Sequence, residues 1–419
     1  MSDENNVFMG IEENFISFGK WLLIATFVGA IVGLVGTAFH FCIDYATELR
    51  LEYTYLIFLL PLGGALIAYL YKTFGLDKEK GTNAVLQAVR SSEVLSGKTA
   101  PLIFISTVIT HLFGGSSGRE GAALQLGGSL ASIIGRHINL SEEDMRIITS
   151  CGMSAGFSAL FGTPITSVVF AMEVSQVGVM NYYALVPALI SSITGFLISQ
   201  SFGVAATRLH IMGIPELTPF ALIQVIILTI LCAFVSILFC LCMRESSRFY
   251  KLHISNKMLR AFVGGVIVIV LTFIVGNFDY NGGGMDIVEK ALSGTARPEA
   301  FILKIIFTAV TLSAGFKGGE IVPSFFVGAT FGNVASSMLG INPSFGAGIG
   351  LIAVFCGVTN CPLTSLILSI ELFGMEGLIF FAAACAISYM LSGYSGLYSA
   401  QKIVYSKAKC EKINRNTIH

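Results

Sequence analysis

Charged side chains are scarce in this sequence. Only 12% of the 419 residues are Asp, Glu, Lys or Arg, whereas about a quarter of the residues of an ordinary soluble domain are charged. Hydrophobic residues account for 54% of the chain, and the mean hydropathy is +0.79. This composition is too apolar for a soluble globular protein, so we interpret the chain as a membrane protein.

The patterns that would indicate enzyme chemistry are also missing. The six histidines show no metal-ligand spacing, and no Ser/His/Asp arrangement or Gly-rich nucleotide loop stands out. The nine cysteines are an odd number and lie mostly within apolar runs, which favours a packing role. We therefore expect no enzyme activity, no metal and no cofactor. The net charge of zero gives no indication of a nucleic-acid partner, and we expect none.

Long apolar runs indicate helical membrane spans. Residues 21–43 and 220–243 are nearly uninterrupted apolar segments, long enough to cross a bilayer as helices. They lack the short alternating pattern of an outer-membrane barrel. Such segments predict about ten spanning or half-spanning helices, several of them short or interrupted by Gly and Pro. The expected fold class is an all-α polytopic membrane protein.

Two pairs of matching segments indicate an internal repeat. TPITSVVFAMEV at 163–174 matches CPLTSLILSIEL at 361–372 with an offset of 198 residues. GSSGRE at 115–120 matches GFKGGE at 315–320 with an offset of 200. Because both pairs keep their order, we interpret the chain as two related halves of roughly 200 residues.

The repeat and the charge distribution together predict the domain organisation. We expect a cytoplasmic N-terminal segment at 1–15, a first membrane repeat at 16–243, a basic linker at 244–260, a second membrane repeat at 261–400 and a basic cytoplasmic tail at 401–419. Lys and Arg gather in the linker and the tail, which places both on the cytoplasmic side. The N-terminal segment is acidic and lacks the features of a signal peptide, so we treat it as part of the mature chain.

A Gly-rich turn precedes an apolar helix in each half, and each turn carries a glutamate, Glu120 or Glu320. In internally repeated transporters, discontinuous helices point their N-termini at the membrane midplane, where free backbone N–H groups and the helix dipole bind an anion. Packing symmetry or a plain loop remains an alternative, but a carboxylate inside a membrane is usually functional. We therefore predict an anion as the substrate.

Six segments carry a family pattern: GREGAALQLG at 118–127, GMSAGFSALFGTPITSVVFAMEV at 152–174, YNGGGMDIV at 280–288, GGEIVPSFFVGATFG at 318–332, GVTNCPLTSLILSIELFG at 357–374 and GLYSA at 396–400. Together they resemble the CLC family of chloride channels and chloride/proton antiporters, whose anion pathway carries the pattern G-R/K-E-G-P. The resemblance implies two inverted-topology repeats whose discontinuous half-helices meet at the membrane midplane. It also implies a homodimer with one anion path per subunit.

The resemblance assigns roles to individual residues. Glu120 is similar to the gating glutamate, which occupies the anion path and swings out when protonated. Tyr398 is similar to the pathway tyrosine whose hydroxyl faces the central anion site, although a structural role at a helix end remains open. The resemblance does not fix the role of Arg119; from its place beside Glu120 we interpret it as holding the loop through backbone carbonyls rather than touching the anion. The same match implies that the anion is bound by Gly81, Thr82, Asn83, Glu120, Ile321, Val322 and Tyr398, with motif support from Gly118, Arg119, Gly121, Gly318, Gly319 and Pro323.

Several departures from the chloride-type pattern are informative. GTNAV replaces G-S-G-I-P, GEIVP replaces G-x-F-x-P with Glu320 in place of the phenylalanine, and Ala122 ends the G-R-E-G-P motif. Val174 stands where chloride/proton antiporters carry a second internal glutamate. These changes resemble the CLC-F subgroup, bacterial fluoride/proton antiporters that protect cells from fluoride.

The leading interpretation is a secondary active transporter in the lipid bilayer of the cell membrane, a bacterial inner membrane, that exports fluoride from the cytoplasm in exchange for protons. A chloride/proton antiporter or a chloride channel of the same fold remains the alternative. A gated sensor without transport would normally need a regulatory domain. About twenty residues follow Tyr398, too few for paired CBS domains.

Four side chains have competing interpretations. Fluoride is a small, strong hydrogen-bond acceptor that needs close donors, and Asn83 offers two N–H groups where the chloride-type serine offers one O–H. Asn83 is equally suited to cap a helix beginning near Ala84. Glu320 is a neutral donor to fluoride, an inward proton-transfer site, or an ion-pair partner of Lys317. Glu173 and Glu371, at the ends of the repeated helices, are interpreted as structural, solvated or paired with a basic loop.

Overall fold

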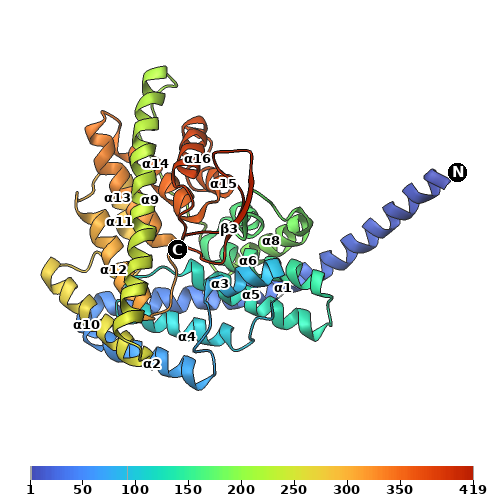
Figure 1. Cartoon of the computed structure of the whole chain (residues 1–419), viewed down its shortest axis with the longest axis horizontal. Helices are drawn as coiled ribbons and strands as arrows, with labels where there is room; N and C mark the ends of the chain where they lie inside the picture. The colour runs from blue at the N-terminus through green and yellow to red at the C-terminus, as the bar shows by residue number, and fades with distance from the viewer. Residues whose placement is uncertain (1, 92, 419) are drawn as a thin grey trace.

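The computed structural model describes residues 2–91 and 93–418, with side chains from residue 12 onward. Sixteen α-helices lie in this part of the chain (Figure 1). The first eight are α1 (Ser2–Glu52), α2 (Leu60–Thr73), α3 (Thr82–Ser91), α4 (Thr99–Leu112), α5 (Glu120–His137), α6 (Glu142–Phe161), α7 (Pro164–Glu173) and α8 (Leu185–Ser201). The next eight are α9 (Pro219–His253), α10 (Lys257–Val275), α11 (Met285–Leu292), α12 (Ala300–Ala314), α13 (Ile321–Met338), α14 (Pro343–Thr359), α15 (Pro362–Phe373) and α16 (Leu378–Leu391). Two 3-10 helices, η1 (Thr54–Leu59) and η2 (Tyr182–Ala184), complete the helical structure.

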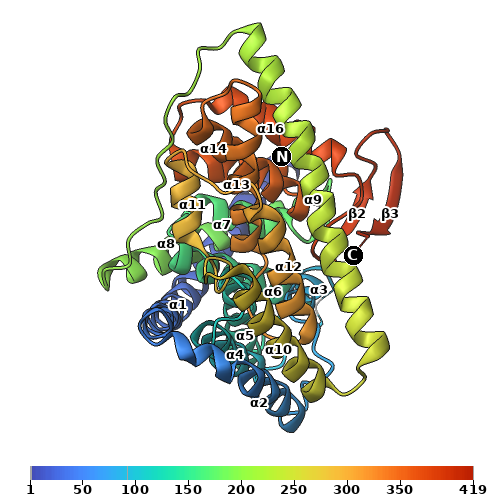
Figure 2. The ribbon, with the colours of Figure 1, turned by 90° about the vertical axis from the view of Figure 1, so that its left-hand side faces the viewer.

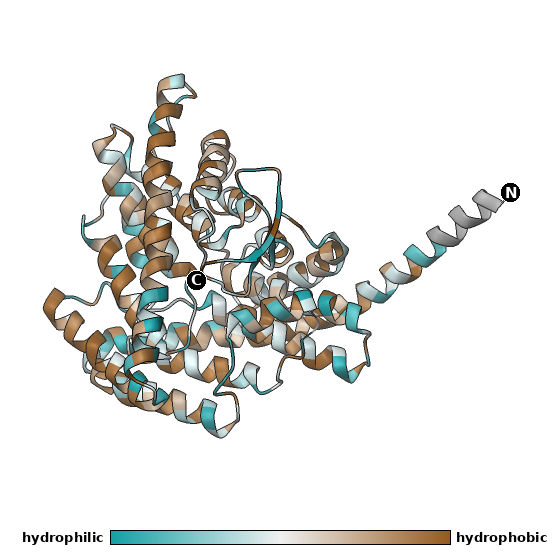
Figure 3. Cartoon of the chain, in the orientation of Figure 1, coloured by the Kyte–Doolittle hydropathy of each residue, from teal (hydrophilic) through white to brown (hydrophobic). Residues whose placement is uncertain are grey.

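Helix length and surface composition agree with a multi-pass membrane protein. Six helical segments of the described chain are long and apolar enough to cross a bilayer, and six more apolar helices have only 10 to 17 residues. Many large apolar side chains are exposed on the outside of the molecule. Examples are Leu23, Phe27, Phe234, Phe273 and Ile274, which are 55 to 75% exposed. In Figure 3 the ribbons of α9 and α10 carry the hydrophobic colour over much of their length. Exposing so many apolar side chains to water would cost free energy, and contact with lipid avoids that cost. Together with the helical structure, this confirms the predicted all-α polytopic membrane fold.

The helices repeat in order and kind. A long first helix begins each set of eight, α5 and α13 both have 18 residues and follow the matched Gly-rich turns, and α7 and α15 both begin at proline. This correspondence makes α9 the counterpart of α1. Residues 244–253 of the predicted linker continue α9, because their polar and basic side chains extend the helix past its apolar part without interrupting it. We propose that the boundary between the repeats lies at 202–218 rather than at 244–260.

Glu173 and Glu371 link the two repeats reciprocally. The Glu371 carboxylate accepts the backbone N–H groups of Ile165 (3.0 Å) and Thr166 (2.8 Å) in the first turn of α7. The Glu173 carboxylate accepts the N–H of Thr364 (2.9 Å) and its hydroxyl (2.6 Å) in the first turn of α15. Carboxylates stabilise the unpaired N–H groups and the positive dipole of a helix start. The predicted structural role is confirmed, with a helix N-terminus as the partner in place of a basic loop.

The C-terminal tail forms a small sheet that the sequence did not predict. Strands β1 (Gln176–Val177), β2 (Lys402–Tyr405) and β3 (Lys412–Asn416) lie in the order β1-β2-β3, the first pair parallel and the second antiparallel. Figure 2 shows β2 and β3 at the side of the helical body. After β3, the Thr417 hydroxyl donates to the Tyr398 carbonyl at 2.5 Å. The tail therefore fixes the turn that carries Tyr398.

Candidate anion site

The two Gly-rich turns meet in the interior of the protein. The Gly118 N–H donates to the Gly319 carbonyl, and the Gly319 N–H donates to the Gly118 carbonyl, each at 2.7 Å. A Cβ atom added at Gly319 would lie 2.5 Å from the backbone nitrogen of Gly121, closer than real Cβ atoms approach. Glycine is needed here because the two backbones touch. The two matched turns are therefore in direct contact.

The Glu120 carboxylate lies among backbone donors from both halves. Its side chain is 1% exposed, and Oε2 accepts the Arg119 N–H at 3.0 Å. The N–H groups of Glu120 and Val322, at the starts of α5 and α13, also face this carboxylate. The other oxygen, Oε1, is buried without a hydrogen-bond partner. These N–H groups have no partner within their own helices, so a small anion in the place of this carboxylate would accept the same hydrogen bonds.

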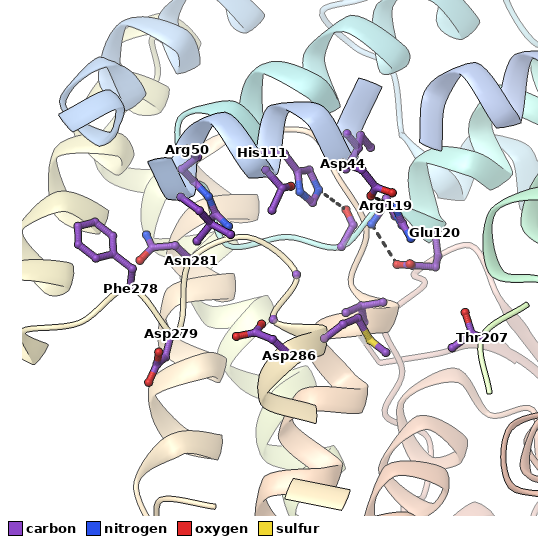
Figure 4. A pocket seen from close by; sticks show the side chains of 18 of the residues that line it. Asp44, Arg50, His111, Arg119, Glu120, Thr207, Phe278, Asp279, Asn281 and Asp286 are labelled. Atoms are coloured by element: carbon purple, nitrogen blue, oxygen red, sulfur yellow. Dashed lines mark hydrogen bonds and ion pairs between the residues drawn. The ribbon is translucent and has the colours of Figure 1, made fainter. Parts of the chain in front are cut away.

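A cavity of about 340 Å³, here called the Glu120 cavity, opens on one side of the paired turns. Figure 4 shows Glu120 and Arg119 on its wall, with Arg50, His111, Asn281 and Asp286 further along. The Arg119 guanidinium donates to the Asp44 carboxylate on α1 at 2.6 Å, and Asp44 also lies 3.0 Å from His40. The prediction that Arg119 holds the loop through backbone carbonyls is wrong, because a carboxylate is the stronger acceptor for a guanidinium.

A second cavity of about 440 Å³, the Glu320 cavity, opens on the other side of the paired turns. The predicted site residues Gly81, Thr82, Asn83, Gly318, Glu320 and Tyr398 line it. Tyr398 is 1% exposed, and its hydroxyl has no hydrogen-bond partner; Oε2 of Glu320 is also buried and unpaired. Buried polar atoms are normally paired with protein or ordered water, so these atoms face a position for water or a ligand.

The structure does not bring all predicted anion-binding residues to one cavity. Glu120 and Val322 line the Glu120 cavity together with Gly118 and Arg119. Ile321 is fully buried in the first turn of α13 and lines neither of the two cavities. The paired turns stand between the cavities, because Gly118 lines one and Gly318 the other. The motif residues thus line two cavities on either side of the paired turns, and we call the backbone crossing between them the constriction.

The supporting motif residues build the constriction itself. A Cβ at Gly118 would lie 2.6 Å from Oε2 of Glu120 and 3.1 Å from Cδ of Pro323. A Cβ at Gly121 would lie 3.4 Å from both Oε2 of Glu320 and Oγ1 of Thr82. The missing side chain at Gly118 therefore lets the Glu120 carboxylate approach the crossing of backbone, and the missing side chain at Gly121 lets Gly319 approach, because a Cβ there would lie 3.0 Å from its Cα.

The Asn83 amide is oriented by the C-terminal end of the second half. Its Oδ1 accepts the Ala400 N–H at 2.8 Å, and Arg90 holds the Ala400 carbonyl at 2.6 Å. Helix α3 begins at Thr82, so Asn83 does not serve as the cap of a helix starting near Ala84. With the oxygen engaged, the Asn83 NH₂ group is the part left to donate into the Glu320 cavity.

Lys317 makes no ion pair with Glu320 among the described residues. Its ammonium lies over the ring of Tyr71, 4.2 Å from the centroid. The third interpretation of Glu320, as a partner of Lys317, is therefore met only in part: the two charges interact electrostatically but do not lie within ion-pair distance.

Sequence reasoning missed several polar residues of the two cavities. Gln125 on α5 lines the Glu320 cavity, and its NH₂ group donates to Oγ1 of Thr82 (3.1 Å) and to the Gly121 carbonyl (3.2 Å). An amide inside an apolar helix shortly after Glu120 was the signal for it. Asp44 carries no comparable signal, because it lies in the long first helix, far from the Gly-rich turns. Asp286 lies in the quoted segment YNGGGMDIV, but that pattern did not single it out as a cavity residue. Within residues 2–91 and 93–418, no group of three or more His, Cys, Asp and Glu side chains is arranged to hold a metal ion.

Comparisons with known proteins agree on one family. A model of the voltage gated chloride channel family matches residues 63–393. A chloride/fluoride channel protein of Pseudomonas syringae pv. tomato is 34% identical over 395 residues, which cover 93% of this chain and 87% of that protein. A crystal structure of a CLC-type fluoride/proton antiporter is 28% identical, with a TM-score of 0.89, over 92% of this chain and 98% of that one. A slow cyanobacterial Cl⁻/H⁺ antiporter, 19% identical with a TM-score of 0.76, over 89% of this chain and 94% of that one, shares the fold. The family match, the motifs and the two repeats agree: this chain belongs to the voltage gated chloride channel, or CLC, family.

Proposed function

We propose that this protein exports fluoride from the cytoplasm in exchange for protons, with Glu120 as the protonatable gate. One observation carries the proposal: a buried carboxylate occupies the point where backbone N–H groups of both repeats converge. The similarity to a solved fluoride/proton antiporter over nearly the whole chain supports fluoride as the anion.

The proposed exchange uses the carboxylate as a competitor of the anion. When ionised, Glu120 takes the Arg119 N–H and keeps the anion out of the constriction. When protonated, it loses its charge and binds these donors less strongly, because hydrogen bonds to charged groups are stronger than those to neutral groups. The anion then takes the vacated donors, and the proton moves with the side chain toward the Glu120 cavity. Proton and anion movements are linked because both need the same position.

Glu320, Tyr398 and Asn83 serve the Glu320 cavity. An ionised Glu320 would repel fluoride, so we propose that it is protonated while an anion is present. It then donates its O–H to fluoride or passes the proton on. Oε2 of Glu320 and the Tyr398 hydroxyl are buried and unpaired, which suits donation to a small anion. The Asn83 NH₂ group supplies a further donor to the same cavity.

The proton gradient supplies the energy in this proposal. Each pH unit across the membrane contributes about 1.4 kcal/mol per proton, and each 100 mV of membrane potential about 2.3 kcal/mol per charge. The driving force is therefore the proton gradient across a bacterial inner membrane. We expect no enzyme activity, no cofactor and no nucleic-acid partner. We also expect a homodimer with one path per subunit, as the family resemblance implies.

A chloride/proton antiporter or chloride channel of the same fold is the second candidate. The chloride-type features Glu120 and Tyr398 are both present and both line the proposed path. The similar Pseudomonas syringae protein is named a chloride/fluoride channel protein. This name supports both chloride as a substrate and channel-type flow without protons as alternatives for this chain.

Anion flux through purified protein in liposomes distinguishes the fluoride/proton antiporter from the chloride transporter or channel. Vesicles are loaded with fluoride in one set and chloride in another, and the external pH is recorded while the anion runs down its gradient. We expect fluoride efflux with uphill proton movement and little chloride efflux. Equal or faster chloride efflux would assign the protein to chloride transport. Fluoride efflux without proton movement would make it a channel.

A further inference from the structure

A third cavity, here called the Tyr71 cavity, lies beside the Glu320 cavity and has a volume of about 290 Å³. It is formed by the end of α2, the loop at 76–79, the ends of α9 and α10 that face each other, and the turn at 314–317. Glu79, Lys251, Arg260 and Lys317 line both cavities, so the two adjoin. Lys251 and Arg260 belong to the basic segment that the positive-inside rule places on the cytoplasmic side.

Three donors line the Tyr71 cavity without a hydrogen-bond partner, although the Glu79 carboxylate interacts electrostatically with Tyr71 and Lys317. Tyr71 is 5% exposed, and its hydroxyl has no hydrogen-bond partner. Nε of Arg260 is likewise buried and unpaired. The Lys317 ammonium lies over the Tyr71 ring and makes no ion pair within the described residues. A phenol O–H, a guanidinium and an ammonium are all donors, and two of them are cationic.

The charges around the cavity favour an anion. Five basic side chains line it against two carboxylates: Lys78, Lys251, Lys257, Arg260 and Lys317 against Asp77 and Glu79. Asp77 is engaged by Lys257, whose ammonium lies 3.8 Å from its carboxylate. One Glu79 oxygen is buried and unpaired, so this carboxylate is the opposing charge that an anion would meet. An opposing charge beside the donors would lower the affinity for an anion, and transport requires that a bound ion can leave again.

We propose that the Tyr71 cavity is a second anion-binding site, in which an anion from the cytoplasm is held by the Tyr71 hydroxyl, Arg260 and Lys317 before it enters the Glu320 cavity. The identity of the anion as fluoride rests on the function proposed above. At this site the donors replace some of the water molecules around a strongly hydrated ion. The backbone N–H groups at Glu120 replace the remaining water molecules in a later step.

The test measures transport as a function of anion concentration at the cytoplasmic face. Everted membrane vesicles expose that face to the medium, and their acidified lumen drives fluoride uptake, which a fluoride electrode follows. Tyr71→Phe removes only the hydroxyl. Because a hydrogen bond to a charged group is stronger than one between neutral groups, we expect the half-saturating fluoride concentration to rise about tenfold or more. The maximal rate and the protons moved per fluoride should stay unchanged.

Tyr69→Phe is the matched control, because Tyr69 lies on the same helix with an exposed side chain. A change in the maximal rate at unchanged half-saturation would make Tyr71 a structural residue and overturn the proposal, as would no change at all. If Tyr71→Phe does not accumulate in the membrane, Arg260→Gln tests the same site with the same expected shift. If the unaltered protein takes up chloride instead of fluoride, the proposed function fails, while the same titration with chloride still tests the cavity.

Discussion

Replacing Glu120 by Gln tests the gate with little change of shape. Gln keeps one carbonyl oxygen that can accept the Arg119 N–H, now 3.0 Å from Oε2, but it cannot ionise. A hydrogen bond to a neutral acceptor is about 1 kcal/mol weaker than one to a carboxylate. The Gln side chain should therefore leave the backbone donors about five times more often than ionised Glu120 does.

The larger consequence concerns coupling. With one proton exchanged per fluoride, a gradient of two pH units at zero membrane potential corresponds to about 2.7 kcal/mol, which sustains a fluoride ratio of about 100 across the membrane. A gate that carries no proton cannot use this gradient. The expected ratio for Glu120→Gln is therefore about one, with fluoride still moving down its own gradient.

The assay uses liposomes with the membrane potential set to zero by potassium and valinomycin, a fluoride electrode and a step in external pH. Glu289→Gln, at an exposed position on α11, is the control and should accumulate fluoride as the unaltered protein does. Accumulation by Glu120→Gln against a fluoride gradient would refute the assignment of Glu120 as the proton-carrying gate. Loss of all fluoride flux in a folded variant would equally contradict the view that the carboxylate competes with the anion.

Three further substitutions test other parts of the structure. Gly319→Ala places a Cβ 2.5 Å from the backbone nitrogen of Gly121 and should lower the free energy of unfolding by about 1–3 kcal/mol. Gly19→Ala, where a Cβ would meet nothing within 4 Å, should be neutral or slightly stabilising in the same thermal unfolding experiment. Asn83→Asp exchanges the NH₂ donor for a negative charge, so half-saturating fluoride should rise at least tenfold in concentration-dependent flux; an unchanged value would remove Asn83 from the anion site. Glu173→Gln weakens the cap on α15 and should cost about 1–2 kcal/mol in thermal unfolding with proton coupling intact; altered coupling would give Glu173 a role in proton transfer.

Much of the site was predictable because the motifs are local. The Gly-rich turns at Glu120 and Glu320 predict helix N-termini, and α5 and α13 begin there. The matched offsets predict that the turns are equivalent, and the Gly118–Gly319 pair brings them together. Family motifs also identified Tyr398, which lines the same cavity as Glu320.

The remaining features could not be predicted because each depends on contacts between distant segments. Arg119 pairs with Asp44 across 75 positions, and the Asn83 amide is oriented by Ala400 across 317. No local pattern specifies which of several acceptors a side chain will meet. The same holds for the tail strand β2, whose partner β1 lies more than 200 positions earlier.

Four properties could be predicted from the order of residues alone: the chain lies in a membrane, is helical, consists of two related halves and carries paired glutamates at Gly-rich helix starts. These properties follow from composition, from apolar run length and from repeated motifs, all of which are read along the chain. Only the tertiary structure decided that Glu120 and Glu320 line different cavities on the two sides of one backbone crossing, and that unpaired donors gather around Tyr71. The reason is physical: cavities and unpaired polar atoms arise where helices from both repeats fail to fill space between them, and that depends on how the helices pack.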